Sequence, residues 1–285
     1  MERRLHWRRW LAGGVRLVER GRRTERSCDV APGLHLFSNW LGAGVFDESG
    51  HRLGWFRDLV TDLVAGAQHP PVTHVVIGAP DGRRLVAPFA SLSARPGTGT
   101  LTLSGTAAPA TESVPGPTSL LVRRDVLDAP VVLAVPPRRT RVSDVVIEVG
   151  PDGAHVVGVD LSTSGMLRRF GGRASSASAQ QAVPLSEVHL ISAHGHAAQL
   201  ATPHPRVLTL PAQGMAEVLT RVPVAHARDI IHAADRDLRE EAVGLLHPHV
   251  RARVTGSGGP PRRTRRLGGW RLHSPATHRR DGDRE

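Results

Sequence analysis

The sequence has little of the material from which large aromatic cores and disulfide frameworks are built. Tyrosine and lysine are absent, and aromatic residues make up only 4% of the chain. Any hydrophobic core must therefore be assembled from valine, leucine, isoleucine and alanine. Cys28 is the single cysteine, which excludes an intramolecular disulfide and is typical of a protein from a reducing compartment.

Long hydrophobic runs are also missing. No apolar stretch approaches the roughly 20 residues that a membrane-spanning helix needs. The LAGGV patch near the N-terminus is too short for the apolar region of a signal peptide. We therefore expect a cytoplasmic protein with no transmembrane segment.

Positive charge is concentrated at the two ends of the chain. The formal net charge is +11, of which residues 1–30 carry +5 and residues 251–285 carry +7, so that the remainder carries −1. The leader could form a short basic amphipathic helix with Trp7, Leu11 and Val15 on one face; we interpret it instead as disordered, or as an extension from an upstream start codon. Nucleic acid or anionic membrane, if bound, is expected to bind through the arginine-rich ends.

A stretch in the first half of the chain occurs twice. LGAGVFDESGHRLGWFRDLV begins at Leu41, and its echo LDAPVVLAVPPRRTRVSDVV begins at Leu127, 86 residues later. The same shift pairs Asp58 with Asp144. We therefore predict two copies of one structural unit.

Short strands and tight turns dominate the first copy. Asp47 to Gly50 and Pro80 to Gly82 have the composition of turns. Strand patterns cover residues 51–63, 72–77 and 84–89. Leu53, Trp55 and Leu59 are expected on the packed side of the first strand. This spacing indicates a small antiparallel barrel rather than a βαβ unit.

The region after the second copy changes character twice. Residues 171–182 are rich in Gly, Ser and Ala and are expected to be mobile. Two strands, 188–191 and 197–200, are predicted on either side of His194-Gly195-His196. Helical periodicity follows, with apolar residues one turn apart in three successive windows. These windows begin at Met215, Ala227 and Leu238.

The three predicted helices have identifiable boundaries. Pro223 and Asp235 stand where first-turn and N-cap residues are expected, and Pro248 opens a fourth turn. Helices of about ten residues are too short to be stable alone in water. They must therefore pack on one another as a stacked repeat.

Two families share these patterns. The two copies resemble PRC-barrel modules, through LGAGVFDESGHRLGWFRDLV…VTHVVIGAPDGRRLVAPFASL and LDAPVVLAVPPRRTRVSDVVIEV…HVVGVDLS. The helical run resembles the start of the intracellular N-terminal domain of MgtE-type magnesium transporters, through MAEVLTRVPVAHARDIIHAADRDLREEAVGLLHPHV. That family continues into CBS domains and a membrane channel, and this sequence contains neither, so ion conduction is not expected of it.

The resemblances imply an α+β fold: two small antiparallel PRC-like β-barrels in tandem, then a short stacked helical repeat, with basic disordered tails. The predicted divisions are a basic leader (1–33), a first barrel unit (34–105), a linker (106–119), a second barrel unit with its linker (120–182), a helical segment (183–250) and a basic tail (251–285).

No constellation typical of an enzyme is present in the sequence. Four histidines lie within sixteen positions: His189, His194, His196 and His204. No cysteine and no HExxH pattern accompanies them, so we interpret them as surface or turn residues rather than zinc ligands. Cys28 lies in the leader with no base beside it to activate it. We expect no catalytic residues and no organic cofactor.

Carboxylates offer a second kind of candidate site. Mg²⁺ prefers one or two carboxylates together with retained waters. The candidate ligands are Asp235, Asp237, Glu240 and Glu241. Helix caps and solvated helix faces explain the same residues. The matched pair Asp58 and Asp144 is interpreted as strand-end or turn residues with backbone partners, rather than as an acid/base pair.

These observations favour a non-enzymatic regulatory or accessory protein related to the soluble part of magnesium transporters. Such a protein would act through protein contacts, with a membrane transporter as the implied partner, and through sensing of a divalent metal. The alternative is a ribosome- or RNA-associated adaptor, because PRC-barrels also occur in ribosome-maturation factors and both ends of the chain are rich in arginine.

Overall fold

The computed structural model describes most of the chain between residues 30 and 256. The described residues are 30, 32–63, 67–95, 99–109, 116–133, 135–162 and 182–256, with the backbone of a hairpin at 265–267 and 270–272. Nearly all of the predicted leader lies outside them, as do residues 171–181, which were expected to be mobile, and most of the predicted basic tail.

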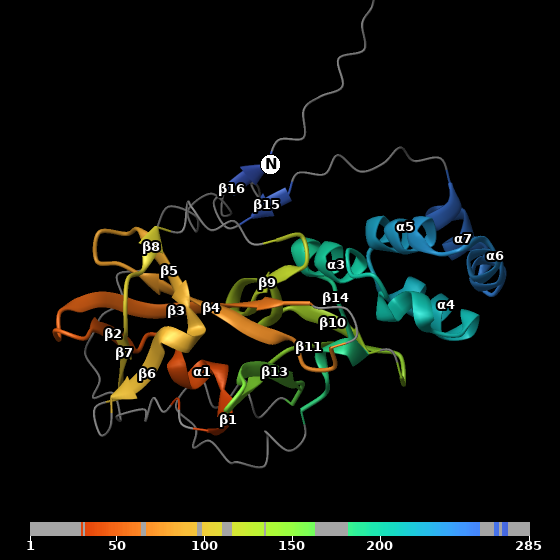
Figure 1. Ribbon diagram of the computed structural model, residues 1–285. Helices are drawn as coiled ribbons and strands as arrows, with labels where there is room; N and C mark the ends of the chain where they lie inside the picture. Colours follow the sequence, from red (N-terminus) through yellow and green to blue (C-terminus); the bar gives the residue numbers. More distant parts are fainter. Residues whose placement is uncertain are drawn as a thin grey trace, which may run out of the picture.

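A curled β-sheet forms one side of the molecule and a group of helices forms the other (Figure 1). Within the described residues the sheet has eleven strands, in the order β1-β12-β13-β4-β3-β2-β7-β6, with β5 and β9 branching from β4 and β3 and with β8 beside β5. The bounds are β1 (Gly33–Leu36), β2 (Gly44–Asp47), β3 (Arg52–Asp62), β4 (Pro71–Gly78), β5 (Arg84–Pro88), β6 (Leu92–Arg95), β7 (Thr100–Leu103), β8 (Ala108–Pro109), β9 (Ser119–Leu121), β12 (Asp144–Gly150) and β13 (Gly153–Asp160).

Smaller elements complete the β part. A second sheet has the order β11-β10-β14. Its strands are β10 (Pro130–Leu133), β11 (Arg138–Arg141) and β14 (Val188–Leu190). The single turns are α1 (Phe37–Trp40), η1 (Phe89–Ser91), η2 (Val122–Val126), η4 (Leu185–Glu187) and η5 (Arg206–Thr209), and the separate hairpin is β15 (Arg265–Leu267) with β16 (Trp270–Leu272).

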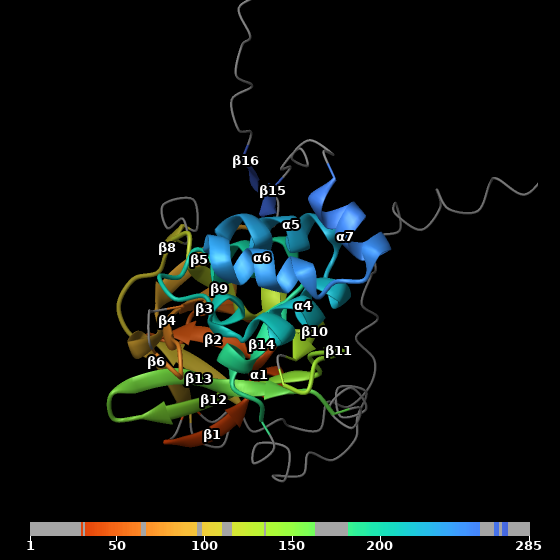
Figure 2. The ribbon, with the colours of Figure 1, turned by 90° about the vertical axis from the view of Figure 1, so that its right-hand side faces the viewer.

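Five helices follow the β strands along the chain. They are α3 (Ala193–Leu200), α4 (Ala212–Arg221), α5 (Val224–Ala233), α6 (Arg236–Gly244) and α7 (Pro248–Thr255). In Figure 2 they lie in front of the strands as one group. None of the described helices combines the length and the hydropathy that crossing a membrane requires. The chain is therefore of mixed α+β class, as predicted.

The duplication seen in the sequence recurs in the strands and in their pairing. β2 and β10 begin and end 86 residues apart. The β3–β4 ladder shifts register between Val60 and Thr61, and the β12–β13 ladder shifts between Val146 and Ile147, which are the corresponding positions. A β-bulge repeated at the same place is a specific structural feature. The 86-residue shift of the sequence thus relates strand bounds and bulges in the two stretches, while the division into two barrels stays a prediction.

The two copies exchange their first strands. β1 of the first copy pairs with β12 of the second, where Leu36 lies opposite Val146. β9 of the second copy pairs with β3 of the first, where Leu121 lies opposite Val60. β4 and β13 then pair with each other. The copies are therefore parts of one sheet.

Asp58 and Asp144 hold this exchange together. Asp58 accepts a hydrogen bond from the backbone N–H of Arg123 in the first turn of η2, at 2.6 Å. Asp144 accepts one from the backbone N–H of Ser38 in the first turn of α1, at 3.2 Å, and one from the Ser38 hydroxyl at 2.5 Å. Each carboxylate also accepts from the amide of the residue that follows it. The prediction that both have backbone partners is confirmed.

The packed face of β3 differs from the prediction. Leu59 is fully buried as expected, but Phe56 is buried in place of Trp55, which is only partly covered and lies under the Arg52 guanidinium at 4.4 Å. Gly54 explains the change of face, because a Cβ there would approach the carbonyl oxygen of Gly78 to 2.2 Å. Only glycine allows β3 and β4 to approach so closely at this point.

Two hydrophobic cores result. The first fills the curled sheet, where Trp40 packs against Phe56 and Phe89 with ring centroids about 6 Å apart. The second lies among α4, α5, α6 and α7 and includes Val132 of β10 and the neighbouring Ile191. These two residues tie the helices to the smaller sheet.

Two expectations for the segment after residue 182 are wrong. Residues 197–200 belong to α3 rather than to a strand, because His196 and Ala198 are buried together with Gly195, which lets the helix approach β14. The predicted division at 183 also separates paired strands, because β14 pairs with β10 of the second copy. The last helix continues to Thr255, beyond the predicted limit of 250.

The helical prediction is otherwise confirmed. α4, α5 and α6 coincide with the three periodic windows, and Pro248 is the first residue of α7. Pro223 precedes α5, and Asp235 caps α6 by accepting a hydrogen bond from the amide of Leu238 at 2.9 Å. The helices are short and depend on their shared core.

This dependence can be measured at Ile230, which is fully buried in the helical core. Ile230→Ala should lower the free energy of unfolding by about 2–5 kcal/mol, because the substitution removes packed methyl and methylene groups and leaves a cavity. The control is Leu245→Ala, just after the end of α6; Leu245 is 56% exposed, and the change should cost about 0.5 kcal/mol or less. Urea unfolding followed by circular dichroism at 222 nm measures both variants. Equal losses would contradict the assigned core.

Candidate functional site

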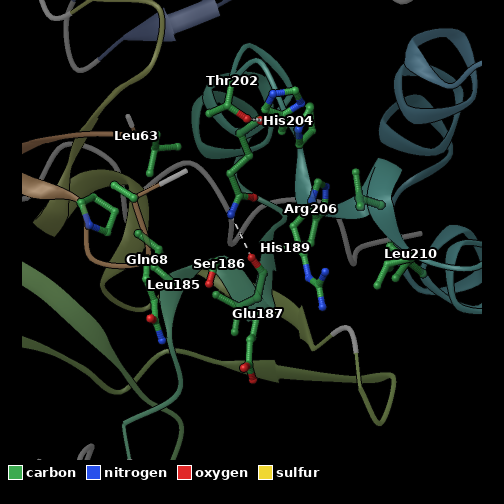
Figure 3. A pocket seen from close by; sticks show the side chains of 17 residues that line it. Leu63, Gln68, Leu185, Ser186, Glu187, His189, Thr202, His204, Arg206 and Leu210 are labelled. Carbon is green, nitrogen blue, oxygen red and sulfur yellow. Dashed lines mark hydrogen bonds between the residues drawn. The ribbon is translucent and has the colours of Figure 1, made fainter. Parts of the chain in front are cut away.

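A pocket of about 400 Å³ lies between the β part and the helices (Figure 3). Its lining comes from the end of β3, from η4 and β14, from the end of α3, and from η5 and α4. The apolar lining includes Leu63, Leu185, Leu210 and Val218. His189, His204 and Arg206 add polar groups. We call this space the joint pocket, because both layers of the molecule contribute to it.

Gln199 fixes the position of α3 beside this pocket. Its side-chain oxygen accepts from the amide of Leu190, and its side-chain nitrogen donates to the carbonyl of Val188, both at 2.8 Å. The amide side chain thus bonds to the edge of β14 as a neighbouring strand would. Gly195 allows the close approach, because a Cβ there would lie 2.8 Å from the side chain of Leu190.

A chain of histidines crosses from β14 to α5. His189 Nε2 and His196 Nδ1 share a hydrogen bond of 2.8 Å. The ring of His196 stacks on that of His226 with centroids 3.9 Å apart and planes 8° apart. His196 Nε2 also lies 3.4 Å from the carboxylate of Asp229. Residues of β14, α3 and α5 are therefore in direct contact at the joint.

Burial keeps this chain from charging easily. Desolvation lowers the pKa of His189 to about 4, with a smaller effect from His226. Desolvation also lowers the pKa of His226, although Asp229 opposes the shift. Since each imidazole has its pKa displaced below the ordinary value near 6.5, both are neutral at pH 7.

The structure does not bring the four clustered histidines together. His189 and His196 meet, but their ring nitrogens bond to each other. His194 Nε2 donates instead to the carbonyl of Ser119 at 2.9 Å, and His204 lines the joint pocket. The interpretation as surface or turn residues is wrong for His189 and His196, which are both buried.

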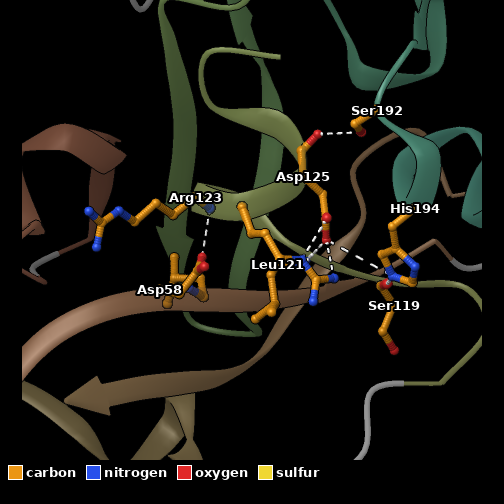
Figure 4. A network of polar contacts seen from close by, with 9 residues as sticks. Asp58, Ser119, Leu121, Arg123, Asp125, Ser192 and His194 are labelled. Carbon is orange, nitrogen blue, oxygen red and sulfur yellow. Dashed lines mark hydrogen bonds and ion pairs between the residues drawn. The ribbon is translucent and has the colours of Figure 1, made fainter. Parts of the chain in front are cut away.

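A second polar network centres on Asp125 (Figure 4). Its carboxylate accepts from the amide of Leu121 at 2.8 Å and pairs with the guanidinium of Arg124 through two contacts of 2.7 Å. Its backbone carbonyl accepts from the hydroxyl of Ser192 at 2.9 Å. The carboxylate also lies 4.0 Å from His194 Nε2. The network links η2 to the start of α3.

These side chains do not form a Ser-His-Asp triad. A triad needs one imidazole nitrogen on the carboxylate and the other on the serine hydroxyl. Here the same Nε2 of His194 faces Asp125 and bonds to a backbone carbonyl, while Ser192 donates to a carbonyl as well. The network joins elements of the fold and offers no activated nucleophile.

Asp58 is the most strongly perturbed carboxyl group whose shift is resolved. Desolvation raises its pKa to about 7, against the hydrogen bonds from Arg123 and Leu59, which favour the charged form. Asp125 raises the pKa further and Arg124 lowers it. Asp58 faces a separate hollow lined by arginines. The net positive charge of the sequence lies at its two ends, so the charge count did not predict that arginines gather around this hollow.

The candidate Mg²⁺ ligands are spread along α6. Asp235 caps the helix, and Glu240 pairs with Arg236 at 2.8 Å. Asp237 and Glu241 are exposed, one turn apart. Among the described residues no group of three or more His, Cys, Asp or Glu side chains is arranged to hold a metal ion. Magnesium binding at α6 stays a prediction.

One sequence signal could have located the edge of the joint pocket. APFASL at residues 87–92 and VPLSEV at residues 183–188 both place a proline after a residue in a β-bridge and continue through a single turn, η1 or η4, into a strand. Val159 pairs with Val183 as Val75 pairs with Ala87. Residues 183–188 therefore belong to the second copy of the repeat, and they lead directly into β14 and His189.

The chain was also compared with known proteins. No protein-family description and no curated protein matches it. Its function must therefore be argued from the joint pocket and the polar networks themselves.

The charge on Asp58 should govern part of the pH dependence of stability. Because its folded pKa is raised, the stability that Asp58 contributes is greatest below about pH 4 and is lost as pH rises towards 7. Asp58→Asn keeps an oxygen acceptor without the charge, so it should raise the free energy of unfolding at pH 8 by about 2–4 kcal/mol, from roughly 1.4 kcal/mol per unit of pKa shift, and change it little at pH 4.

Chemical denaturation at both pH values measures this effect. Asp58→Ala is the control, since it removes the acceptor of the Leu59 and Arg123 amides and should destabilise at either pH by about 1–3 kcal/mol. If Asp58→Asn and the wild type show the same difference between pH 4 and pH 8, Asp58 is not the titrating group.

Proposed function

We propose that this chain is a non-catalytic regulatory or accessory protein that responds to a small ligand at the joint pocket. The single observation that supports the proposal is the position of the pocket between the two layers of the fold. A ligand there touches β14, α3, η5 and α4 together. Its binding energy would therefore favour one arrangement of the helices on the strands.

The lining suggests the chemistry of this ligand. The apolar walls accept a hydrocarbon body, and Arg206 supplies a permanent positive charge. Pockets of about 300–1,000 Å³ hold small organic molecules, usually with a few polar groups that fix their orientation. A small amphipathic carboxylate, with its acid group directed at Arg206, suits this combination.

Family resemblance supports the regulatory class. The duplicated β unit resembles PRC-barrel modules, and α4 to α7 cover the run that resembles the N-terminal domain of MgtE-type transporters. Both are non-catalytic modules that act through contacts with other domains. The proposed output is a protein contact made by the helices, with a membrane transporter as the proposed partner and Mg²⁺ sensing at Asp237 and Glu241 as a further element.

Octanoate is a suitable probe for the joint pocket. It should raise the melting temperature of the wild-type protein, because a ligand that binds only the folded state stabilises by about 1.4 kcal/mol at ten times its Kd. Arg206→Gln should abolish most of the increase. The matched control, Arg236→Gln, removes an exposed arginine from α6 and should leave it unchanged.

Hydrogen exchange identifies where the probe acts. Slower exchange is expected in β14 and η5, on both sides of the pocket. Equal responses of the two arginine variants, or no response to any straight-chain acid from butyrate to decanoate, would contradict the proposed ligand class.

An RNA-associated adaptor is the second candidate. It is favoured by the ten arginines among residues 251–285 and the nine among residues 1–30. If RNA binds through these ends, removing residues 1–29 and 257–285 should abolish nearly all affinity. Each phosphate neutralised should add about 0.7–0.9 to the slope of log affinity against log salt. Fluorescence anisotropy with labelled oligouridine, at several salt concentrations, measures both quantities. Undiminished affinity in the shortened chain would show that the arginine-rich ends do not bind the RNA.

A further inference from the structure

A second hollow, of about 510 Å³, lies beside the turn between β4 and β5 and the start of η2. Five arginines line it: Arg57, Arg83, Arg84, Arg123 and Arg124. The only acidic side chain in its lining is Asp58. We call this hollow the arginine pocket. It is separate from the joint pocket and its chemistry is different.

The balance of charge in the arginine pocket is positive. Asp81 pairs with Arg83 at 2.6 Å, and Asp125 pairs with Arg124 at 2.7 Å. Counting Asp58 as fully ionised, three carboxylates face five guanidinium groups, which leaves an excess of two positive charges. Arginine stays charged at every physiological pH, so this excess is permanent.

Two of the arginines are available to a ligand. Arg57 and Arg123 are exposed and form no ion pair with any of the described residues. In Figure 4 the side chain of Arg123 extends away from Asp125 and His194, although its backbone amide bonds to Asp58. Exposed guanidinium groups that share one hollow repel each other. An anion between them would relieve that repulsion.

The local backbone places Arg57 over this hollow. The pairing of β3 with β4 skips Arg57, because Phe56 and Asp58 lie opposite consecutive residues of β4. A bulge of this kind redirects a side chain. Gly78 makes room for it, since a Cβ at that position would come within 2.6 Å of Arg57 Nε.

The second copy of the repeat shows that the fold does not need these arginines. By the 86-residue shift, Ser143 corresponds to Arg57. Ser38 corresponds to Arg123, because each donates its amide to the aspartate of the other copy. The same framework is therefore built twice, and at these two described positions the second copy has serine where the first has arginine.

We propose that the arginine pocket binds the phosphate groups of a small phosphorylated molecule. Guanidinium groups bind phosphate oxygens through paired, charge-assisted hydrogen bonds. An extended RNA strand fits less well, because it needs a continuous track of cations. Asp81 and Asp125 lie beside the hollow, where they would repel a phosphate backbone leaving it. The proposal does not depend on the function assigned to the joint pocket.

Calorimetric titration of the full chain with pyrophosphate tests this site. The double variant Arg57→Gln, Arg123→Gln should bind at least tenfold more weakly than the wild type. The matched control, Arg236→Gln with Arg239→Gln, removes the same charge from α6 and should change affinity by less than twofold. Because both variants keep the arginine-rich ends, binding there cannot account for a difference between them.

Three further outcomes decide the matter. Inorganic phosphate should compete with pyrophosphate in the wild type and in the control. Equal affinity in the two double variants would overturn the proposal, provided that circular dichroism shows both to be folded. Oligouridine that binds more tightly than pyrophosphate, with an affinity that falls only in the Arg57 and Arg123 variant, would also overturn it and make the pocket an RNA contact.

Discussion

The fold depends on two buried carboxylates that each bond to the opposite copy of the repeat. Asp58 reaches the amide of Arg123, and Asp144 reaches Ser38. These hydrogen bonds satisfy the buried carboxyl oxygens, whose burial without partners would be costly. The exchange of β1 and β9 supplies these partners. Separate packing of each copy would leave both aspartates and both first turns without their hydrogen bonds.

The same exchange explains where the helices attach. η2 carries the amide that bonds to Asp58, and the carboxylate of Asp125 within η2 belongs to the network that reaches His194 at the start of α3. β14 extends the second copy and presents His189 to His196. The helical layer is therefore joined to the duplicated sheet by the contact between His189 and His196, by the Asp125 network and by backbone hydrogen bonds. Contacts of this kind have a defined geometry, and a ligand in the adjoining pocket can favour that geometry or oppose it.

Local chemistry explains which parts of the fold were accessible from the sequence. Turn residues, β-branched runs and the spacing of apolar residues predicted β3, β4, β5 and three helices, because each of these signals acts over a few residues. The duplication was visible because Leu41 to Val60 and Leu127 to Val146 keep apolar residues and an aspartate at the same spacing, although their first turns differ in sequence. The burial of Phe56 in place of Trp55 was not accessible, since it follows from a contact between Gly54 and Gly78, which lie far apart in the sequence.

The candidate sites were harder to predict from the sequence, because their residues also lie far apart along the chain. A count of charges along the chain gives −1 for its central part, and an average of this kind hides any local excess. Arg57, Arg84 and Arg123 become neighbours only when β3, β5 and η2 are assembled. The histidine chain likewise needs β14, α3 and α5. His226 lies thirty residues from His196 in the sequence, yet their rings stack.

The differences between the two copies separate structure from function more clearly than either copy alone. Positions that the framework requires are kept, as with Asp58 and Asp144, whereas Arg57 and Arg123 are replaced by serines at equivalent places.

The buried groups differ in how their protonation affects the stability of the fold as pH changes. Protonation of Asp58 favours the folded state as pH falls from about 7 to 4, while the depressed pKa of His189 opposes folding as pH falls below about 6.5. These contributions have opposite signs over nearly the same range. The two contributions therefore offset each other across mildly acidic pH, although in the folded state Asp58 titrates near pH 7 while His189 stays neutral until about pH 4.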